Sequence, residues 1–121
     1  MNELVTVTKA LADETRLRIL GALDGRELCL CQLTAIFDAT PSTISTHCGI
    51  LKRAHLVECR KEGRWHYYRT AGPGAPPMVR DALRWVREAL RDNPQSRSDA
   101  QRLRAVTAVS AEELCRRRNG S

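Results

Sequence analysis

The stretch PSTISTHCGILKRA, residues 41–54, decides how we interpret the fold of this chain. Thr40 precedes it and is a residue type that caps helix N-termini, and the proline that opens the stretch suits the first helical position. Ile44, Cys48 and Leu51 recur at helical spacing and predict one apolar, inward face. Small polar side chains crowd the outer faces near the N-terminal end; they are Ser42, Thr43, Ser45, Thr46 and His47.

Upstream of this helix, the apolar periodicity predicts three more helices. The first covers residues 2–12. The second begins after Asp13, a residue type that caps helices, and closes at Asp24. The third is LCLCQLTAIFD, residues 28–38. Because only a short connection separates the third helix from the helix over 41–54, the pair is typical of a helix-turn-helix unit.

Downstream of the pair, the sequence predicts a hairpin and a long helix. In LVECRKEGRWHYYRT, residues 56–70, two β-prone runs flank Glu62 and Gly63, which favours a tight hairpin. PMVRDALRWVREALRDN, residues 77–93, has the pattern of an amphipathic helix. We therefore expect a mostly α, winged helix-turn-helix fold with five core helices plus a two-stranded β-hairpin wing.

The last part of the chain is polar and weakly patterned from Pro94. Ser110 and Glu113 form a capping-box pattern, which predicts one short helix there. We expect one winged-helix domain for DNA binding and dimerisation over residues 1–92, and a polar, partly mobile tail over 93–121.

Composition narrows the classes of partner. The 121 residues include 20 Lys and Arg against 14 Asp and Glu, a formal net charge of +6, which favours a polyanionic partner. The chain has no apolar run long enough to cross a bilayer, so no membrane partner is expected. The N-terminal residues lack the basic and then apolar pattern of a secretory signal. We therefore expect a cytoplasmic protein whose thiols are reduced.

Double-stranded DNA is the polyanion that the polar helix and the hairpin suit best. Hydroxyl and imidazole side chains at the N-terminal end of a second helix can reach base edges and phosphates in the major groove. Lys61 and Arg64 near the hairpin tip can contact the phosphate backbone. The alternatives are a Ser- and Thr-rich surface helix and a solvated charged turn without a ligand.

Two cysteines stand one residue apart in ELCLCQL, residues 27–33. In a regular helix Cys29 and Cys31 would point in nearly opposite directions, whereas in an extended segment they would share a face. The five cysteines of the chain have no spacing typical of a disulfide framework, so in a reducing compartment the pair is expected to be ligands or redox sensors. The alternative is that both are small core residues.

Four blocks in this order resemble the ArsR (SmtB/ArsR) family of bacterial metalloregulators, over about residues 8–91. They are ADETRLRILGAL, ELCLCQL, PSTISTHCGILKRAHLV and RKEGRWHYYR. The resemblance implies a homodimeric winged-helix repressor with its first and last core helices at the dimer interface. It also implies that the dimer binds operator DNA and is released by an inducer. Members with this form of the second block look like arsenite and antimonite sensors, which implies an As(III) or Sb(III) site at Cys29 and Cys31.

The third ligand is open. Some family members carry a further cysteine three residues after the second, where this chain has Thr34. Cys115 is our candidate for a third ligand, although it can equally be an incidental exposed thiol. Cys48, Cys59 or a thiol from solution are alternatives, since free cysteine often packs as a small apolar residue.

To bring both sulfurs of the pair to one ion, the first turn of the third helix has to be irregular or be distorted by the ligand. Because this helix packs next to the DNA-reading helix in the fold, such a distortion could bias the dimer against DNA binding.

Other functions stay open beside arsenic sensing. Cadmium or lead could bind the same thiols, because sulfur sites discriminate soft metals poorly. Zinc is less suited: zinc-sensing members of the family that this chain resembles use Asp and His on the last core helix, and here the helix over 77–93 holds Asp81 but no histidine. An oxidant sensor would need a strained Cys29–Cys31 disulfide. A thiol-redox enzyme would be expected to carry a Cys-x-x-Cys motif, which is absent, so we expect no enzyme.

Overall fold

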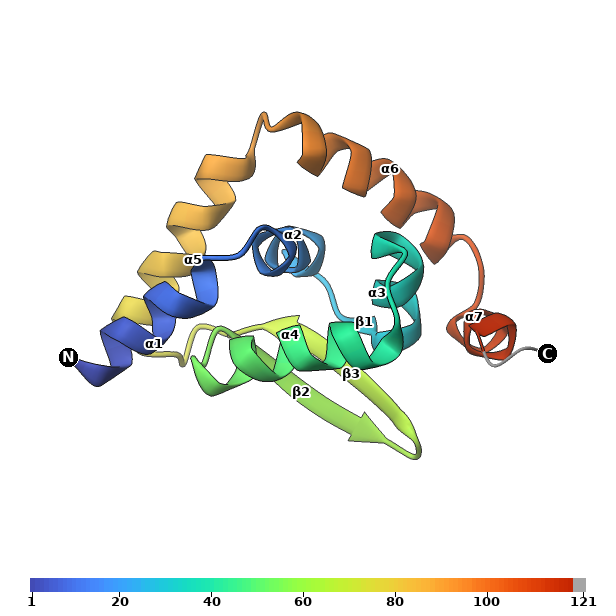
Figure 1. Ribbon diagram of the computed structural model, residues 1–121, viewed down its shortest axis with the longest axis horizontal. Helices are drawn as coiled ribbons and strands as arrows, with labels where there is room; N and C mark the ends of the chain where they lie inside the picture. Colours follow the sequence, from blue (N-terminus) through green and yellow to red (C-terminus); the bar gives the residue numbers. More distant parts are fainter. Residues whose placement is uncertain (119–121) are drawn as a thin grey trace.

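The computed structural model describes residues 1–118, and the side chains of all of these except residues 111, 117 and 118. Its elements follow in the order α1 (Asn2–Leu11), α2 (Glu14–Leu23), β1 (Leu28–Cys29), α3 (Leu30–Phe37), α4 (Pro41–Arg53), β2 (Val57–Glu62), β3 (Trp65–Thr70), α5 (Pro77–Leu90), α6 (Pro94–Thr107) and α7 (Ala111–Arg118). The mostly α, winged helix-turn-helix prediction is confirmed. In Figure 1, α4 and the β2–β3 hairpin lie on one side of α2, and α6 crosses the other side.

The apolar stripe of α4 faces the core as the spacing predicts. Ile44, Cys48 and Leu51 are all 0% exposed, and they pack with buried side chains of α2 and α3, including Ile19 and Leu33. Burial of apolar surface at this junction fixes α4 against α3 and leaves the polar faces of α4 to solvent.

Helix ends form where the sequence places capping residues. The Asp13 carboxylate accepts a hydrogen bond from the backbone N–H of Arg16 at 3.0 Å, and the Thr40 hydroxyl accepts one from the N–H of Thr43 at 3.2 Å. Gly63 has φ +62° at the turn between β2 and β3, a conformation that favours glycine. Local sequence signals therefore set the start of α2, the start of α4 and the tip of the wing.

The predicted start of the third helix is wrong by two residues. Leu28 and Cys29 form a short strand, β1, which pairs antiparallel with Tyr68 and Tyr67 of β3, and the sheet has the order β1-β3-β2. The hairpin therefore gains a third strand, and α3 begins only at Leu30. The backbone can pair in this way because residues before the helix have unsatisfied N–H and C=O groups that the β3 edge satisfies.

The weakly patterned residues from Pro94 form two helices, α6 and α7, that pack on α2 and α3. Asp99 anchors α6: it is 5% exposed and accepts hydrogen bonds from Arg18 Nε at 2.9 Å and Nη2 at 2.8 Å. Arg102 donates to the backbone carbonyl of Ile36 at 3.2 Å. These polar contacts, together with the buried Leu103, fix α6 across α2 and α3. Within the described part of the chain, no helix has both the length and the apolar content needed to cross a bilayer.

Candidate nucleic-acid face and thiol site

The N-terminal half of α4 presents small polar side chains to solvent. Ser42, Thr43, Ser45 and Thr46 are exposed. Thr46 donates its hydroxyl proton to the Ser42 carbonyl at 2.9 Å, so its oxygen keeps acceptor capacity. Because these four side chains are short, a ligand with polar edges can approach the helix backbone closely.

His47 lies on the same helix but is half-buried, and it has a partner that the sequence did not indicate. Its Nδ1 atom lies 3.2 Å from Nη1 of Arg16 at the start of α2. Arg16 belongs to the ADETRLRILGAL block, yet nothing in its spacing marks it as a neighbour of α4, because the two residues are 31 positions apart.

The charges of the wing divide into two groups. Arg60 is bonded to Glu27 and Glu62 and lies 4.5 Å from the centre of the Tyr67 ring. Arg69 pairs with Glu58 at 2.9 Å.

In contrast, Lys61 and Arg64 are exposed and have no carboxylate partner among residues 1–118. The two predicted wing contacts are therefore the cations left unneutralised near the tip, where they can pair with an external anion.

Cys29 occupies the junction between β1 and α3. It is 1% exposed, its backbone is extended with φ −84° and ψ 164°, and it is the N-cap of α3. Its sulfur accepts a hydrogen bond from the backbone N–H of Gln32, while the Gln32 side chain accepts one from the Cys29 N–H at 2.9 Å. The start of α3 is thus already irregular. A site shared with Cys31 needs either such an irregular start or a distortion caused by the ligand, and the structure has the first of these.

Cys31 and Cys115 meet although 84 positions separate them. The structure joins them in a disulfide, with their Cα atoms 5.4 Å apart, so the expectation of reduced thiols does not hold for this pair. Leu114, next to Cys115, is 7% exposed and packs α7 against the body of the protein. Of the candidates for a third thiol, Cys115 is the one that the structure brings to Cys31 (Figure 1 shows α7 beside α3).

The remaining positions fit structural roles. Thr34 is fully buried and donates to the Cys31 carbonyl at 2.8 Å. Cys48 is 0% exposed, and burial raises the pKa of its thiol to about 12, which keeps it protonated. Cys59 is a half-buried free thiol 3.9 Å from His66 on the neighbouring strand. In the described residues no three His, Cys, Asp or Glu side chains gather closely enough to hold a metal ion.

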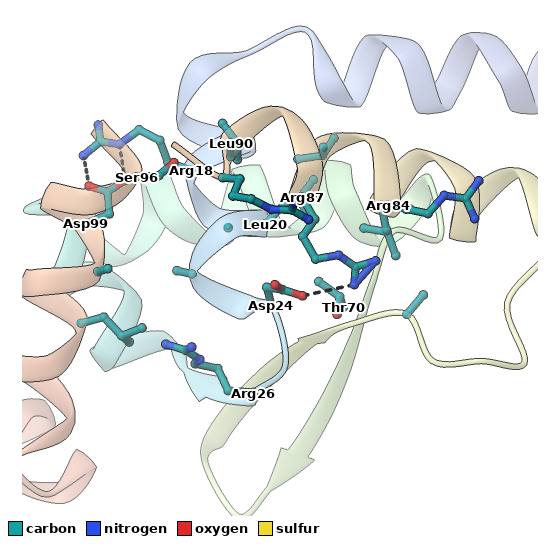
Figure 2. Close-up of a pocket in the computed structure, with 18 of the residues that line it drawn as sticks. Arg18, Leu20, Asp24, Arg26, Thr70, Arg84, Arg87, Leu90, Ser96 and Asp99 are labelled. Carbon is teal, nitrogen blue, oxygen red and sulfur yellow. Dashed lines mark hydrogen bonds and ion pairs between the residues drawn. The ribbon is translucent and has the colours of Figure 1, made fainter. Parts of the chain in front are cut away.

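A groove of about 670 Å³ runs between α2, α5 and α6, and its lining includes no residue of α4. Figure 2 shows two ion pairs along it, Arg18 with Asp99 and Arg87 with Asp24, the latter at 3.6 Å. Leu90 of α5 also faces the groove. The Arg18–Asp99 pair joins α2 to α6, and the Arg87–Asp24 pair joins α5 to the end of α2. Movement of α6 is therefore opposed by charge as well as by packing.

Comparison with known proteins agrees with this geometry. Residues 13–58 match the family described as bacterial regulatory protein, arsR family. The chain is 39% identical over 94 residues to the arsenic resistance transcriptional regulator ArsR1 of Pseudomonas putida, a match that covers 74% of the chain and 72% of that relative. The chain belongs to the ArsR family. It is also 46% identical over 61 residues to the arsenical resistance operon repressor of Bacillus subtilis.

The match to the Bacillus repressor covers 50% of the chain and 58% of that repressor. A match to a homologue from Halobacterium salinarum covers 60% of that homologue. Among solved structures, the homodimeric winged helix-turn-helix DNA-binding domain Mb0332 of Mycobacterium bovis superposes with a TM-score of 0.61 at 32% identity. This match covers 73% of the chain and 75% of that domain. These ArsR-family relatives are transcriptional regulators.

Proposed function

We propose that this ArsR-family chain is a homodimeric transcriptional repressor that binds double-stranded operator DNA and is released by arsenite or antimonite. The observation that carries the proposal is the meeting of Cys31 and Cys115 at the start of α3, the helix that packs directly on α4. Residues 1–92 would hold the DNA-binding and dimerisation functions, and the residues after them would supply a ligand.

The DNA-binding part rests on the polar end of α4 and the free cations of the wing. Hydroxyl groups along α4 suit base edges and phosphates in the major groove. Lys61 and Arg64 suit the backbone beside it, because neither has a carboxylate to neutralise it within the described chain. The contact residues would be Ser42, Thr43, Ser45, Thr46, His47, Lys61 and Arg64.

The inducer part rests on the chemistry of the thiols. A soft, thiol-seeking ion prefers sulfur to nitrogen or oxygen ligands. After reduction of the disulfide, Cys31 and Cys115 would supply two thiolates from adjacent helices. Cys29 would supply the third by giving up its hydrogen bond from the Gln32 N–H. Thr34, where some relatives have a cysteine, is buried and would take no part.

Cys29 connects the proposed ion site to the DNA-binding surface. Its backbone pairs with Tyr67 in the wing, and its side chain caps α3. If its sulfur turns toward Cys31, the β1 pairing and the first turn of α3 both change. The wing and α4 would then leave their DNA-competent arrangement, since α3 packs on α4 and β3 continues into the wing.

The test is a titration of arsenite into the reduced protein bound to a fluorescent operator duplex, followed by anisotropy. We expect arsenite to release the DNA from the wild type, and Cys31→Ser and Cys115→Ser to bind DNA normally but resist release. Cys59→Ser is the matched control, since Cys59 is a free thiol on the wing away from the pair. Release that persists in both serine variants would exclude this ligand set.

Parallel titrations with cadmium, lead and zinc test the nearest alternative. Thiolate sites accept several soft ions, so we expect partial release by cadmium or lead and none by zinc, which has no histidine set here. Release by cadmium alone would reassign the inducer while leaving the thiol site in place.

A specific observation favours oxidant sensing as a second candidate function. Cys31 and Cys115 are already close enough to bond, whereas a Cys29–Cys31 disulfide would close a strained ring. With hydrogen peroxide, the two thiols would give one disulfide and two waters, so the thiols lose two electrons and two protons. Peroxide-dependent release that dithiothreitol reverses, and that Cys115→Ser abolishes, would support this function over metalloid sensing.

A further inference from the structure

We infer that Arg16 is a positioning residue that locks His47 in one tautomer. As a result α4, the recognition helix, presents the His47 Nε2–H group to DNA as a hydrogen-bond donor. This inference rests on the proposed operator binding. It assigns Arg16, which lies outside the expected DNA-contact set, a part in DNA recognition.

Arg16 is held by three elements at once. Its Nε donates to the Ala10 carbonyl at 2.7 Å and its Nη2 to the Lys9 carbonyl at 3.1 Å, so it closes the C-terminal end of α1. Its backbone N–H donates to Asp13, and its Nη1 lies 3.2 Å from Nδ1 of His47. The side chain is 13% exposed, so the guanidinium has little freedom to turn elsewhere.

Chemistry then decides the state of His47. A guanidinium has five N–H donors and no acceptor, and it stays charged at any pH at which the protein is folded. Its partner Nδ1 must therefore be the acceptor and carry no proton. A neutral imidazole has one proton on its two nitrogens, so that proton sits on Nε2. The ring is half-buried, which together with the Arg16 contact holds its free edge in one direction.

The consequence is a fixed donor next to the hydroxyl groups of α4. Serine and threonine hydroxyls can either donate or accept, whereas a locked Nε2–H can only donate. It would therefore suit an acceptor on DNA, either a phosphate oxygen or a purine N7 or O6 in the major groove. Because Arg16 also binds the end of α1, any shift of α1 would release the ring.

The first experiment needs no DNA. Long-range ¹H–¹⁵N correlation spectra of the wild-type protein at pH 8.5 report which nitrogen of His47 carries the proton, with His47→Asn used for assignment. We expect a single Nε2–H tautomer, and in Arg16→Leu an averaged or changed pair of nitrogen shifts. A His47 proton on Nδ1, or spectra identical in wild type and Arg16→Leu, would overturn the inference even if the protein binds its operator.

The second experiment asks whether the donor reaches DNA. His47→Asn keeps an acceptor for Arg16 near the Nδ1 position but lacks the outer donor, and His47→Gln places an amide N–H near the Nε2 position. We expect operator affinity to fall at least tenfold for His47→Asn, because one directed hydrogen bond to DNA contributes roughly a factor of ten in affinity. We expect the affinity of His47→Gln to stay within about threefold of the wild type. Equal affinities for the wild type and His47→Asn would refute a DNA contact.

A double-mutant cycle separates positioning from general stability. If Arg16 acts through His47, Arg16→Leu weakens operator binding in the wild type but adds little in the His47→Asn background. Additive losses would overturn the inference, and circular dichroism of each variant confirms that it is folded; Arg16→Lys replaces Arg16→Leu if the latter unfolds. A scrambled duplex distinguishes the acceptor, because loss on both duplexes indicates a phosphate and loss on the operator alone a base. Failure of the wild type to bind any operator would instead refute the proposed function.

Discussion

The Asp99→Asn substitution tests whether the ion pair between α2 and α6 is structural. Asp99 is 5% exposed and receives two hydrogen bonds from Arg18 and one from Gln95 at 3.1 Å. Asparagine keeps the size but loses the charge and turns one acceptor into a donor facing Arg18. Removing one partner of a fully buried pair costs roughly 3–5 kcal/mol. The Arg18 side chain is 24% exposed, so water recovers part of that loss and we expect about 2 kcal/mol.

Urea unfolding followed by circular dichroism measures the effect. With an m-value on the order of 2 kcal/mol/M, a loss of about 2 kcal/mol lowers the unfolding midpoint by about 1 M. The matched control is Asp92→Asn, because Asp92 has an 86% exposed side chain and lies 3.7 Å from Arg97. We expect the control to change stability by less than about 0.5 kcal/mol. An Asp99→Asn protein as stable as the control would refute the reasoning that α6 is held by this pair.

Three further predictions follow from caps, turns and buried acids. Burial raises the pKa of Cys48 and of Tyr68 to about 12, so the folded state holds these protons more tightly than the unfolded chain. The free energy of unfolding should therefore fall as the pH rises from about 9 to 12. A free energy of unfolding that stays constant across that range in urea titrations would contradict this. The N–H of Arg16, followed by its charge, lowers the pKa of Asp13; Asp13→Ala should therefore cost about 1 kcal/mol at pH 7, and calorimetry should show this difference vanish as the pH falls through that lowered pKa. Gly63→Ala, at φ +62°, should cost about 1 kcal/mol and lower the thermal midpoint by a few degrees, whereas an unchanged midpoint would mean that the turn relaxes.

Elements set by local signals could be predicted from the sequence. The helix over residues 41–54 has a cap, a proline at its first position and an apolar stripe, and its observed bounds, Pro41–Arg53, differ by one residue. The hairpin follows from β-prone runs around a glycine turn. In both cases the residues that form the element also supply the interactions that end it, so no distant partner is needed.

Elements that depend on distant partners could not be predicted in this way. Leu28 and Cys29 fit a helical pattern. They become a strand only because Tyr67 and Tyr68, at the edge of β3, offer their backbone groups for pairing. The sequence pattern does not predict the helix over Pro94–Thr107 for a related reason. It is strongly polar, and its position depends on Asp99, whose partner is 81 residues away.

The candidate thiol site shows the same division. The Cys29–Cys31 pair is visible as a motif, and its awkward spacing indicates an irregular helix start. The choice of Cys115 over Cys48 and Cys59 depends on how α7 packs, and neither spacing nor composition determines that packing. The burial of Cys48 follows from the apolar stripe over residues 41–54, whereas the contact of Cys59 with His66 emerges only once the strands pair.

The recognition helix is held from two directions, and this explains how signals at a distance could act on one DNA-binding surface. On one side α3 packs on α4, and its first turn carries Cys29 and Cys31. On the other side α1 contacts α4, and Arg16 links the end of α1 to His47. A metalloid ion would act through the first contact, and a change at α1, the helix expected at the dimer interface, would act through the second. Because α4 is packed between both, a displacement on either side would move the same polar face, so ligand binding and dimer geometry would be thermodynamically coupled without any direct contact between their sites.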